Sequence, residues 1–309
     1  MKQFSEPGSV PFLEFGGEGE SLFFAHANGY PPLSYRSLLE PLTQSHQVIA
    51  GLHRPLWPEP EPPELLRSWR VFGKDVESLL ASRGQAAFGM GHSMGTAALI
   101  SAAVHRPELF KGLILIEPVL VPSSYCWSLR MFKPLVRRTL PLVRRTLARQ
   151  HEWPDRQQAF DHFRPKAVFK RISDEVLWDY VNYGLAERDN GRVGLAFSRE
   201  WEAACYLSVQ NIWPLLDKLN MPILAIRAER SNVITQGSWQ RLRDKCPQHR
   251  YEEIGGTGHL VPLERPHDIL QLVSSWLAEQ SQNFWARRIG QLRRLIAQQS
   301  CRQISWELN

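Results

Sequence analysis

One serine of this 309-residue chain stands in a setting suited to nucleophilic catalysis. Ser93 lies in Gly91-His92-Ser93-Met94-Gly95, which fits the nucleophile-elbow pattern G-x-S-x-G. Glycines are required because the chain passes from a strand into a helix in a very tight turn, where a side chain at either position would collide with its neighbours. The turn pushes the serine outward at a helix N-terminus, where developing negative charge is favoured. The sequence therefore predicts Ser93 as a nucleophile.

A serine hydroxyl needs a base, and His259 is the candidate. It lies in Gly255-Gly-Thr-Gly-His-Leu260, a loop between the last predicted strand and the last predicted helix, downstream of the serine. A third segment, Phe24-Ala-His-Ala-Asn-Gly-Tyr-Pro31, follows an early strand and carries small residues that let backbone amides approach a substrate oxygen. We expect the amides of Asn28 and Met94 to form an oxyanion hole, with His26 bracing the loop.

The elements that must position these residues alternate between strand and helix. Apolar runs predict strands, and apolar residues at helical spacing predict helices. The predicted strands are 21–26, 47–52, 86–90, 112–116, 222–226 and 250–254, and the predicted helices are 33–44, 64–81, 94–105 and 266–277. This alternation predicts an α/β fold, a mostly parallel sheet covered by helices on both faces.

The alternation stops between about residues 121 and 207, a long, basic, aromatic stretch with helical patterning and no convincing strand. We therefore predict a core of residues 1–120 and 208–280, a helical cap at 121–207 and an appended tail at 281–309. The cap contains a tandem duplication, PLVRRTL at 134–140 and again at 141–147. It is either a slipped duplication tolerated in a loosely packed surface segment or a selected basic helical face. The cap aromatics are likewise either the lining of an acyl pocket or the cap's own core; they are Trp127, Trp153, Phe160, Phe163, Trp178, Tyr180 and Tyr183.

With these signals in this order, the chain resembles the α/β-hydrolase fold family over roughly residues 10 to 280. His26-Ala-Asn-Gly29 looks like the subgroup with HANG where commoner members have HG-x-P. The resemblance implies that Ser93 is the nucleophile and His259 the general base, and that the loop after an early strand supplies an oxyanion amide. It also implies hydrolysis of an ester, thioester, amide or carbon–carbon bond without a metal or organic cofactor.

The chain departs from the family at the catalytic acid. The family's aspartate usually follows the strand that corresponds to 223–227, but Ser231 or Asn232 stands at that place here. Glu229 is a carboxylate nearby, and Glu117 ends the preceding strand, where some similar members place the acid. We favour Glu117 as the acid. Three alternatives stay open: Glu229 as the acid, Asn232 as a neutral group that orients His259, and no orienting residue at all.

Composition and charge bound the function class. Hydrophobic residues make up 43% and charged residues 22%, which excludes a largely disordered chain. The net charge of +6 is uneven, because residues 127–172 hold twelve Lys or Arg against three Asp or Glu, and residues 281–309 hold five against one. A mildly acidic body with two basic attachments argues against a nucleic-acid binder. Four scattered cysteines without a CxxC motif, and the absence of a signal or a long apolar run, predict a cytoplasmic protein.

The leading function is a serine hydrolase cleaving a small or medium carboxylic ester or thioester through an acyl-enzyme. One alternative is a ligand-binding or sensor protein that kept the fold and lost turnover. Another is a peripheral membrane protein that acts on a lipid ester. In the tail, Trp285, Ile289, Leu292 and Ile296 share a helical face and arginines lie away from it. Such a helix either lies on an anionic membrane surface, as the second alternative requires, or packs on the domain or on a partner subunit. The basic cap and tail are therefore candidate membrane contacts.

Overall fold

An eight-stranded sheet organises the first of two compact units, residues 1–270 and 271–309. The computed structural model describes residues 2–4 and 8–282, and the predicted amphipathic tail helix at 285–296 lies outside them. The strand order is β1-β2-β4-β3-β5-β6-β10-β11. The strands span Lys2–Phe4 (β1), Phe12–Gly16 (β2), Glu20–Ala25 (β3), His46–Gly51 (β4), Ala87–His92 (β5), Phe110–Ile116 (β6), Ile223–Ala228 (β10) and Arg250–Ile254 (β11).

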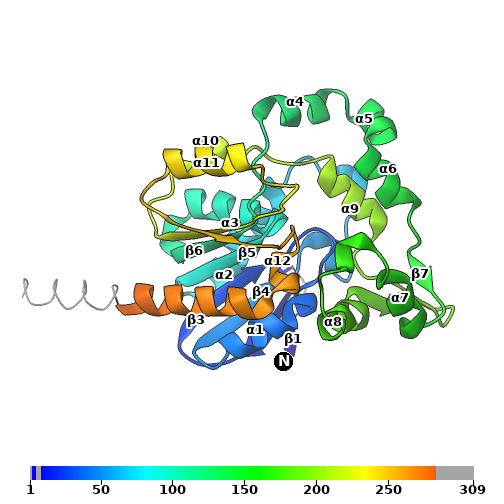
Figure 1. Cartoon of the computed structure of the whole chain (residues 1–309), viewed down its shortest axis with the longest axis horizontal. Helices are drawn as coiled ribbons and strands as arrows, with labels where there is room; N and C mark the ends of the chain where they lie inside the picture. The colour runs from blue at the N-terminus through cyan, green and yellow to red at the C-terminus, as the bar shows by residue number, and fades with distance from the viewer. Residues whose placement is uncertain (1, 5–7, 283–309) are drawn as a thin grey trace, which may run out of the picture. The chain divides into compact units, whose positions relative to one another are not determined.

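Six neighbouring strands of this sheet, β4, β3, β5, β6, β10 and β11, are parallel to one another. At one edge, β2 pairs antiparallel with β4 and with β1. Helices flank this sheet (Figure 1), so the predicted α/β fold with a mostly parallel sheet is confirmed. The core helices are Arg36–Leu42 (α1), Arg70–Arg83 (α2), Met94–His105 (α3), Trp213–Leu216 (α10), Gln236–Lys245 (α11) and Val261–Glu264 (α12). Residues 266–282 are also helical, and the helix continues into the second unit.

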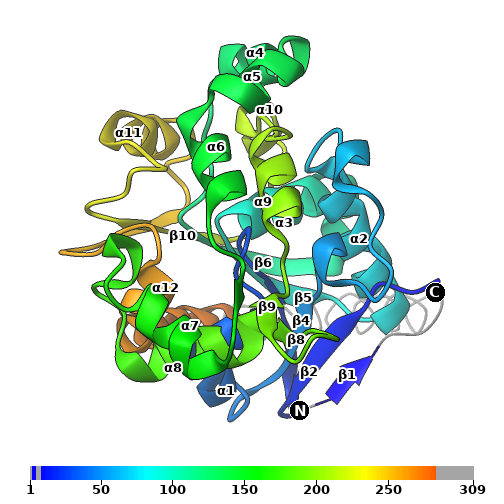
Figure 2. The same cartoon turned by 90° about the vertical axis from the view of Figure 1, so that its right-hand side faces the viewer.

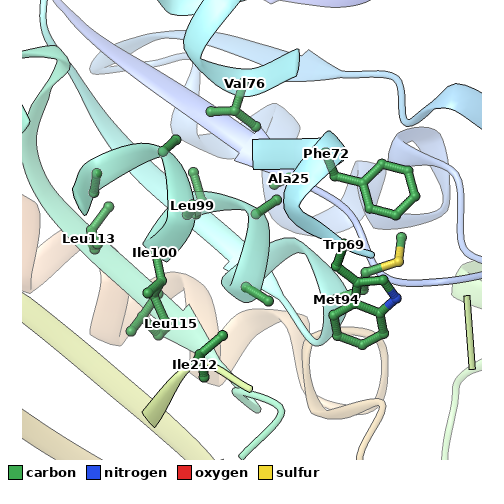
Figure 3. Packing of buried hydrophobic residues seen from close by; sticks show 14 of the residues in the cluster. Ala25, Trp69, Phe72, Val76, Met94, Leu99, Ile100, Leu113, Leu115 and Ile212 are labelled. Atoms are coloured by element: carbon green, nitrogen blue, oxygen red, sulfur yellow. The ribbon is translucent and has the colours of Figure 1, made fainter. Parts of the chain in front are cut away.

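An extended hydrophobic cluster fixes helix α3, which follows Ser93, in the fold. Helix α3 is buried along nearly its whole length, and Met94, Leu99 and Ile100 are each 0% exposed. Figure 3 shows these side chains with Trp69 and Phe72, which lie at the start of α2. A helix that is apolar all round needs partners on every side. The cluster supplies them from the sheet and α2, and so holds the first turn of α3 rigidly.

Residues 121–207 fall between β6 and β10 (Figure 2), as expected for an insertion. Their helices are Ser123–Met131 (α4), Lys133–Thr139 (α5), Pro141–Ala148 (α6), Arg156–Phe163 (α7), Asp174–Gly184 (α8) and Arg199–Tyr206 (α9). We call this segment the cap. The prediction that it holds no strand is wrong, because Glu152–Trp153 (β7), Leu185–Glu187 (β8) and Val193–Leu195 (β9) form a small antiparallel sheet. Strands of two or three residues are too short to show an alternating pattern.

Other boundaries also differ from the prediction. The helix predicted from Glu64 begins only at Arg70, because Pro62 and Pro63 start a separate 3-10 turn. The indole N–H of Trp69 then donates to the carbonyl of Cys205 in the cap at 2.9 Å, which ties the start of α2 to α9. Strands β1 and β2 and helix α11 were not predicted. None of the described helices is long and apolar enough to cross a membrane.

Candidate active site

The turn around Ser93 has the strained geometry that its flanking glycines predict. Ser93 adopts φ 54° and ψ −116° between β5 and α3, a backbone conformation that costs energy in a non-glycine residue. A Cβ on Gly95 would lie 2.0 Å from the carbonyl oxygen of Ala25, and one on Gly91 would lie 2.8 Å from Leu99 Cδ1. Glycine is therefore required at position 95 by the close approach of α3 to the end of β3, and at position 91, in β5, by the close approach of α3 itself.

Three side chains from the carboxyl ends of different strands meet beside this turn. Ser93 Oγ lies 2.9 Å from His259 Nε2, and His259 Nδ1 lies 2.9 Å from Glu117 Oε2. Because a carboxylate only accepts hydrogen bonds, Nδ1 carries the proton and Nε2 is free to accept from the serine hydroxyl. The arrangement is a continuous Ser–His–Glu relay in chain order Ser93, Glu117, His259.

The position of Glu117 follows from the sheet. Strand β6 lies between β5 and β10, so its end adjoins both the nucleophile's strand and the strand that the family's acid usually follows. Glu117 has φ 53°, and its N–H donates to the carbonyl of Ile226 at 2.7 Å. This turn directs a fully buried side chain toward His259. Positive φ in a glutamate is uncommon and marks a constrained site.

The buried carboxylate of Glu117 is stabilised by further donors. Its Oε1 accepts the N–H of Ala228 at 2.6 Å, and its Oε2 also accepts the hydroxyl of Ser231. Ser231 stands at the position where the family's aspartate is expected, and its hydroxyl donates to the carboxylate of Glu117. Of the other two candidates, Glu229 accepts the N–H of Gly256 at 2.6 Å, and the side chain of Asn232 is exposed. The geometry brings Glu117 to His259 and leaves Glu229 and Asn232 apart from it.

Two backbone N–H groups, those of Asn28 and Met94, have no hydrogen-bonding partner among the described residues. Both residues are buried. Met94 is the first residue of α3, where N–H groups lack partners within the helix. The Asn28 side chain donates to the carbonyl of Glu202 in the cap at 3.1 Å. Free, buried N–H groups at a helix start and in a loop beside a nucleophile form a suitable oxyanion hole.

The comparisons with known proteins show the family of the chain. The family model described as "Alpha/beta hydrolase family" matches residues 22–272. This chain belongs to the α/β hydrolase family. An uncharacterized hydrolase of Bacillus subtilis, YugF, is 24% identical over 283 residues, covering 90% of this chain and 97% of the relative.

Solved structures share the fold of this α/β hydrolase. The E-2-(acetamidomethylene)succinate hydrolase superposes with a TM-score of 0.72 at 17% identity, over 87% of this chain and 95% of the other. An esterase of Mycobacterium tuberculosis superposes with a TM-score of 0.69 at 20% identity, over 90% and 91% of the two chains. At such low identity, these likenesses establish the fold and leave the substrate open.

In this α/β hydrolase, His26 holds the loop that follows β3. His26 Nε2 accepts the N–H of His53 at 3.2 Å, and His53 Nε2 donates to the carbonyl of His26 at 3.0 Å. Burial lowers the pKa of His53 to about 4 and lowers the pKa of His26 well below its usual value. Both rings are therefore neutral near neutral pH, which agrees with the expected bracing role of His26.

A second network, which sequence reasoning missed, joins the loop after β3 to the backbone of His259. His92 Nε2 donates to the backbone carbonyl of His259 at 2.8 Å, so its Nδ1 accepts from the hydroxyl of Tyr35 at 2.8 Å. The Tyr35 oxygen accepts the N–H of Ala27 at 3.4 Å. Burial lowers the pKa of His92, which keeps it neutral. No short-range signal identifies Tyr35, because its partners are distant in sequence.

The cap aromatics mostly form the cap's own core. Trp153, Phe163 and Tyr180 are at most 8% exposed, and the ring centroids of Trp153 and Phe163 are 4.9 Å apart. Phe160 and Trp178 stack at 4.5 Å between centroids. Trp127 and Tyr183, in contrast, are exposed. Within the described residues no group of three or more His, Cys, Asp and Glu side chains is arranged to hold a metal ion.

Met94→Leu is expected to retain most of kcat, because Met94 would act through its backbone N–H. The side chain is fully buried in the core cluster, and a volume-conserving Met-to-Leu change costs less than about 1.5 kcal/mol of stability. Steady-state kinetics on one ester, together with the melting temperature, check this. A loss of about two decades or more, typical of removing an oxyanion donor, would show that the side chain participates.

Proposed function

We propose that this protein is a serine hydrolase that cleaves a small or medium carboxylic ester or thioester through an acyl-enzyme. The observation that carries the proposal is the unbroken relay from Ser93 through His259 to the buried carboxylate of Glu117, with both contacts at 2.9 Å. Ser93 is 8% exposed, so the nucleophile's residue retains some solvent access.

In the first half of the reaction, Ser93 Oγ attacks the substrate carbonyl carbon while its proton moves to His259 Nε2. The carbonyl oxygen becomes an oxyanion, and the N–H groups of Asn28 and Met94 donate to it. Collapse of the tetrahedral intermediate breaks the bond to the alcohol or thiol, which leaves with the proton from His259. Ser93 is left esterified by the acyl group.

In the second half, His259 takes a proton from water as the water oxygen attacks the acyl carbon. The Ser93 ester bond then breaks, the carboxylic acid leaves, and the proton returns to Ser93 Oγ. In both halves Glu117 holds His259 in the tautomer with a free Nε2 and stabilises the imidazolium. The fully buried side chain of Glu117 accepts hydrogen bonds from Ala228, Ser231 and His259, and these donors replace the water that it has lost.

The substrate class rests on what the site supplies. Side chains, two amides and water complete the proposed reaction, so it needs no metal or organic cofactor. The relay and the two amides suit attack on the acyl carbonyl of an ester or thioester, and an esterase is among the solved structures that share this fold. We also propose a cytoplasmic location, because Cys126, Cys205 and Cys246 are free thiols in the structure.

Labelling of the whole chain by a fluorophosphonate, followed by turnover of p-nitrophenyl esters of increasing acyl length, tests this function. We expect stoichiometric labelling and a maximum of kcat/KM at a short or medium acyl chain. If the protein binds such esters but shows neither labelling nor turnover, it is the non-catalytic ligand-binding protein, and the proposal is wrong.

A further inference from the structure

The outer side of the cap exposes large apolar side chains that nothing in the described structure covers. Helices α4, α5 and α6 bury Leu129 and Val143 against α9, which accounts for one side of this segment. The same segment carries five large apolar residues, each between 43% and 60% exposed: Trp127, Met131, Phe132, Leu135 and Leu142. Apolar side chains clustered on one surface of a soluble domain mark an interaction site.

In each of the helices α4, α5 and α6, an arginine follows one of these apolar residues by three positions. Trp127 is followed three residues later by Arg130, Leu135 by Arg138, and Leu142 by Arg145. Residues three apart in a helix are surface neighbours. We call these eight residues, the five apolar side chains and the three arginines, the outer face.

The tandem duplication repeats this pattern. In the first copy Leu135 is exposed, Val136 is partly buried and Arg138 is exposed; the second copy matches it with Leu142 exposed, Val143 buried and Arg145 exposed. Both copies thus send valine inward and leucine with arginine outward. The two copies form two helices, α5 and α6, that repeat the same exposed basic and apolar positions.

The charges of the outer face are unpaired. Residues 123–148 contain six Lys or Arg and no Asp or Glu. Among the described residues, Arg130 and Arg138 have no hydrogen-bonding or ion-pair partner, and Arg145 reaches only the carbonyl of Pro141 in its own helix. Figures 1 and 2, drawn from perpendicular directions, both place α4 and α5 at the side of the cap turned away from the sheet. The surface is therefore free to meet a large partner.

We propose that the outer face is a docking surface for an anionic lipid bilayer. Exposed Trp and Phe suit the interfacial region of a membrane, and interspersed arginines suit negatively charged headgroups. A protein partner or a second copy would need matching acidic residues, and α4–α6 have none of their own to pair with these arginines. This inference does not rest on the proposed hydrolysis, since binding is measured separately from turnover.

Sedimentation of the full chain with vesicles tests the proposal. We expect binding to equimolar phosphatidylcholine–phosphatidylserine vesicles and little binding to phosphatidylcholine alone. Binding should be lost at 1 M salt, where the Debye length is about 3 Å and the attraction between arginines and headgroups is screened. Arg138→Gln with Arg145→Gln should weaken binding about fivefold per arginine, roughly 25-fold for the pair. Trp127→Ser with Leu135→Ser should weaken it about tenfold or more.

Matched controls distinguish binding through the outer face from binding through the overall positive charge of the protein. Every variant keeps the tail at 281–309, so the tail cannot account for a difference between variants. Arg70→Gln with Arg243→Gln removes the same charge from exposed positions on α2 and α11, and Val168→Ser removes an exposed apolar residue from the turn between α7 and α8. These should bind as the wild type does, with unchanged ester turnover and melting temperature throughout. Wild-type binding by both outer-face variants would overturn the proposal. So would an outer-face effect seen only on oligomeric state, which would point to a second copy.

Discussion

Ser93→Ala is expected to abolish fluorophosphonate labelling and to lower kcat for a chromogenic ester by about six decades, the loss seen when a serine protease loses its nucleophile. The hydroxyl is the atom that would attack and the atom that donates to His259 Nε2. The fold should persist, because Ser93 contributes its N–H to the Ile116 carbonyl at 3.0 Å, and alanine keeps that bond.

Ser101→Ala is the matched control for this variant. Ser101 is a buried serine on the same helix α3, and its hydroxyl donates to Gln210 Oε1 at 3.2 Å, away from His259. It should keep full labelling and turnover. Labelling of the Ser93→Ala protein at another serine, or wild-type turnover by it, would contradict the nucleophile assignment.

Glu117→Gln is expected to lower kcat by about four decades, the cost of replacing the acid of a serine-protease triad by an amide. A carboxylate can accept from Ala228 and His259 together, but an amide presents an NH2 group to one of them. If the NH2 faces His259, Nδ1 must accept, and the proton moves to Nε2. The histidine then cannot take the proton of Ser93.

The same substitution should change stability far less than it changes rate. One buried donor loses its acceptor in Glu117→Gln, which costs about 1–3 kcal/mol. The measurement is kcat on one ester and the melting temperature of each variant. Glu229→Gln and Asn232→Ala are the controls and should be nearly silent, because Glu229 bonds Gly256 and the Asn232 side chain is exposed. A large loss at Glu229 with a silent Glu117 would place the acid after β10 instead.

The sequence by itself determined the elements that depend on interactions between residues close together in the chain. The elbow could be predicted because two glycines, a serine and the flanking apolar runs are consecutive, and the steric limits on the turn act between near neighbours. Helix α3 and strand β11 accordingly have the predicted bounds, Met94–His105 and Arg250–Ile254. Short or irregular elements were missed or displaced, such as β7 and the late start of α2. A strand of two residues, such as β7, is too short to show an alternating pattern. Prolines before α2 interrupt the helical spacing of apolar residues.

Tertiary structure decided how the strand ends meet. The sequence offered Glu117, Glu229 and Asn232 as partners of the histidine, each following a buried strand. Only the order β5-β6-β10, with positive φ at Glu117, brings one of these three to His259, 142 residues away in the chain. Likewise, Tyr35 reaches His92 only after β3 and β5 pair. Such contacts depend on which strands become neighbours, and that depends on packing the whole core.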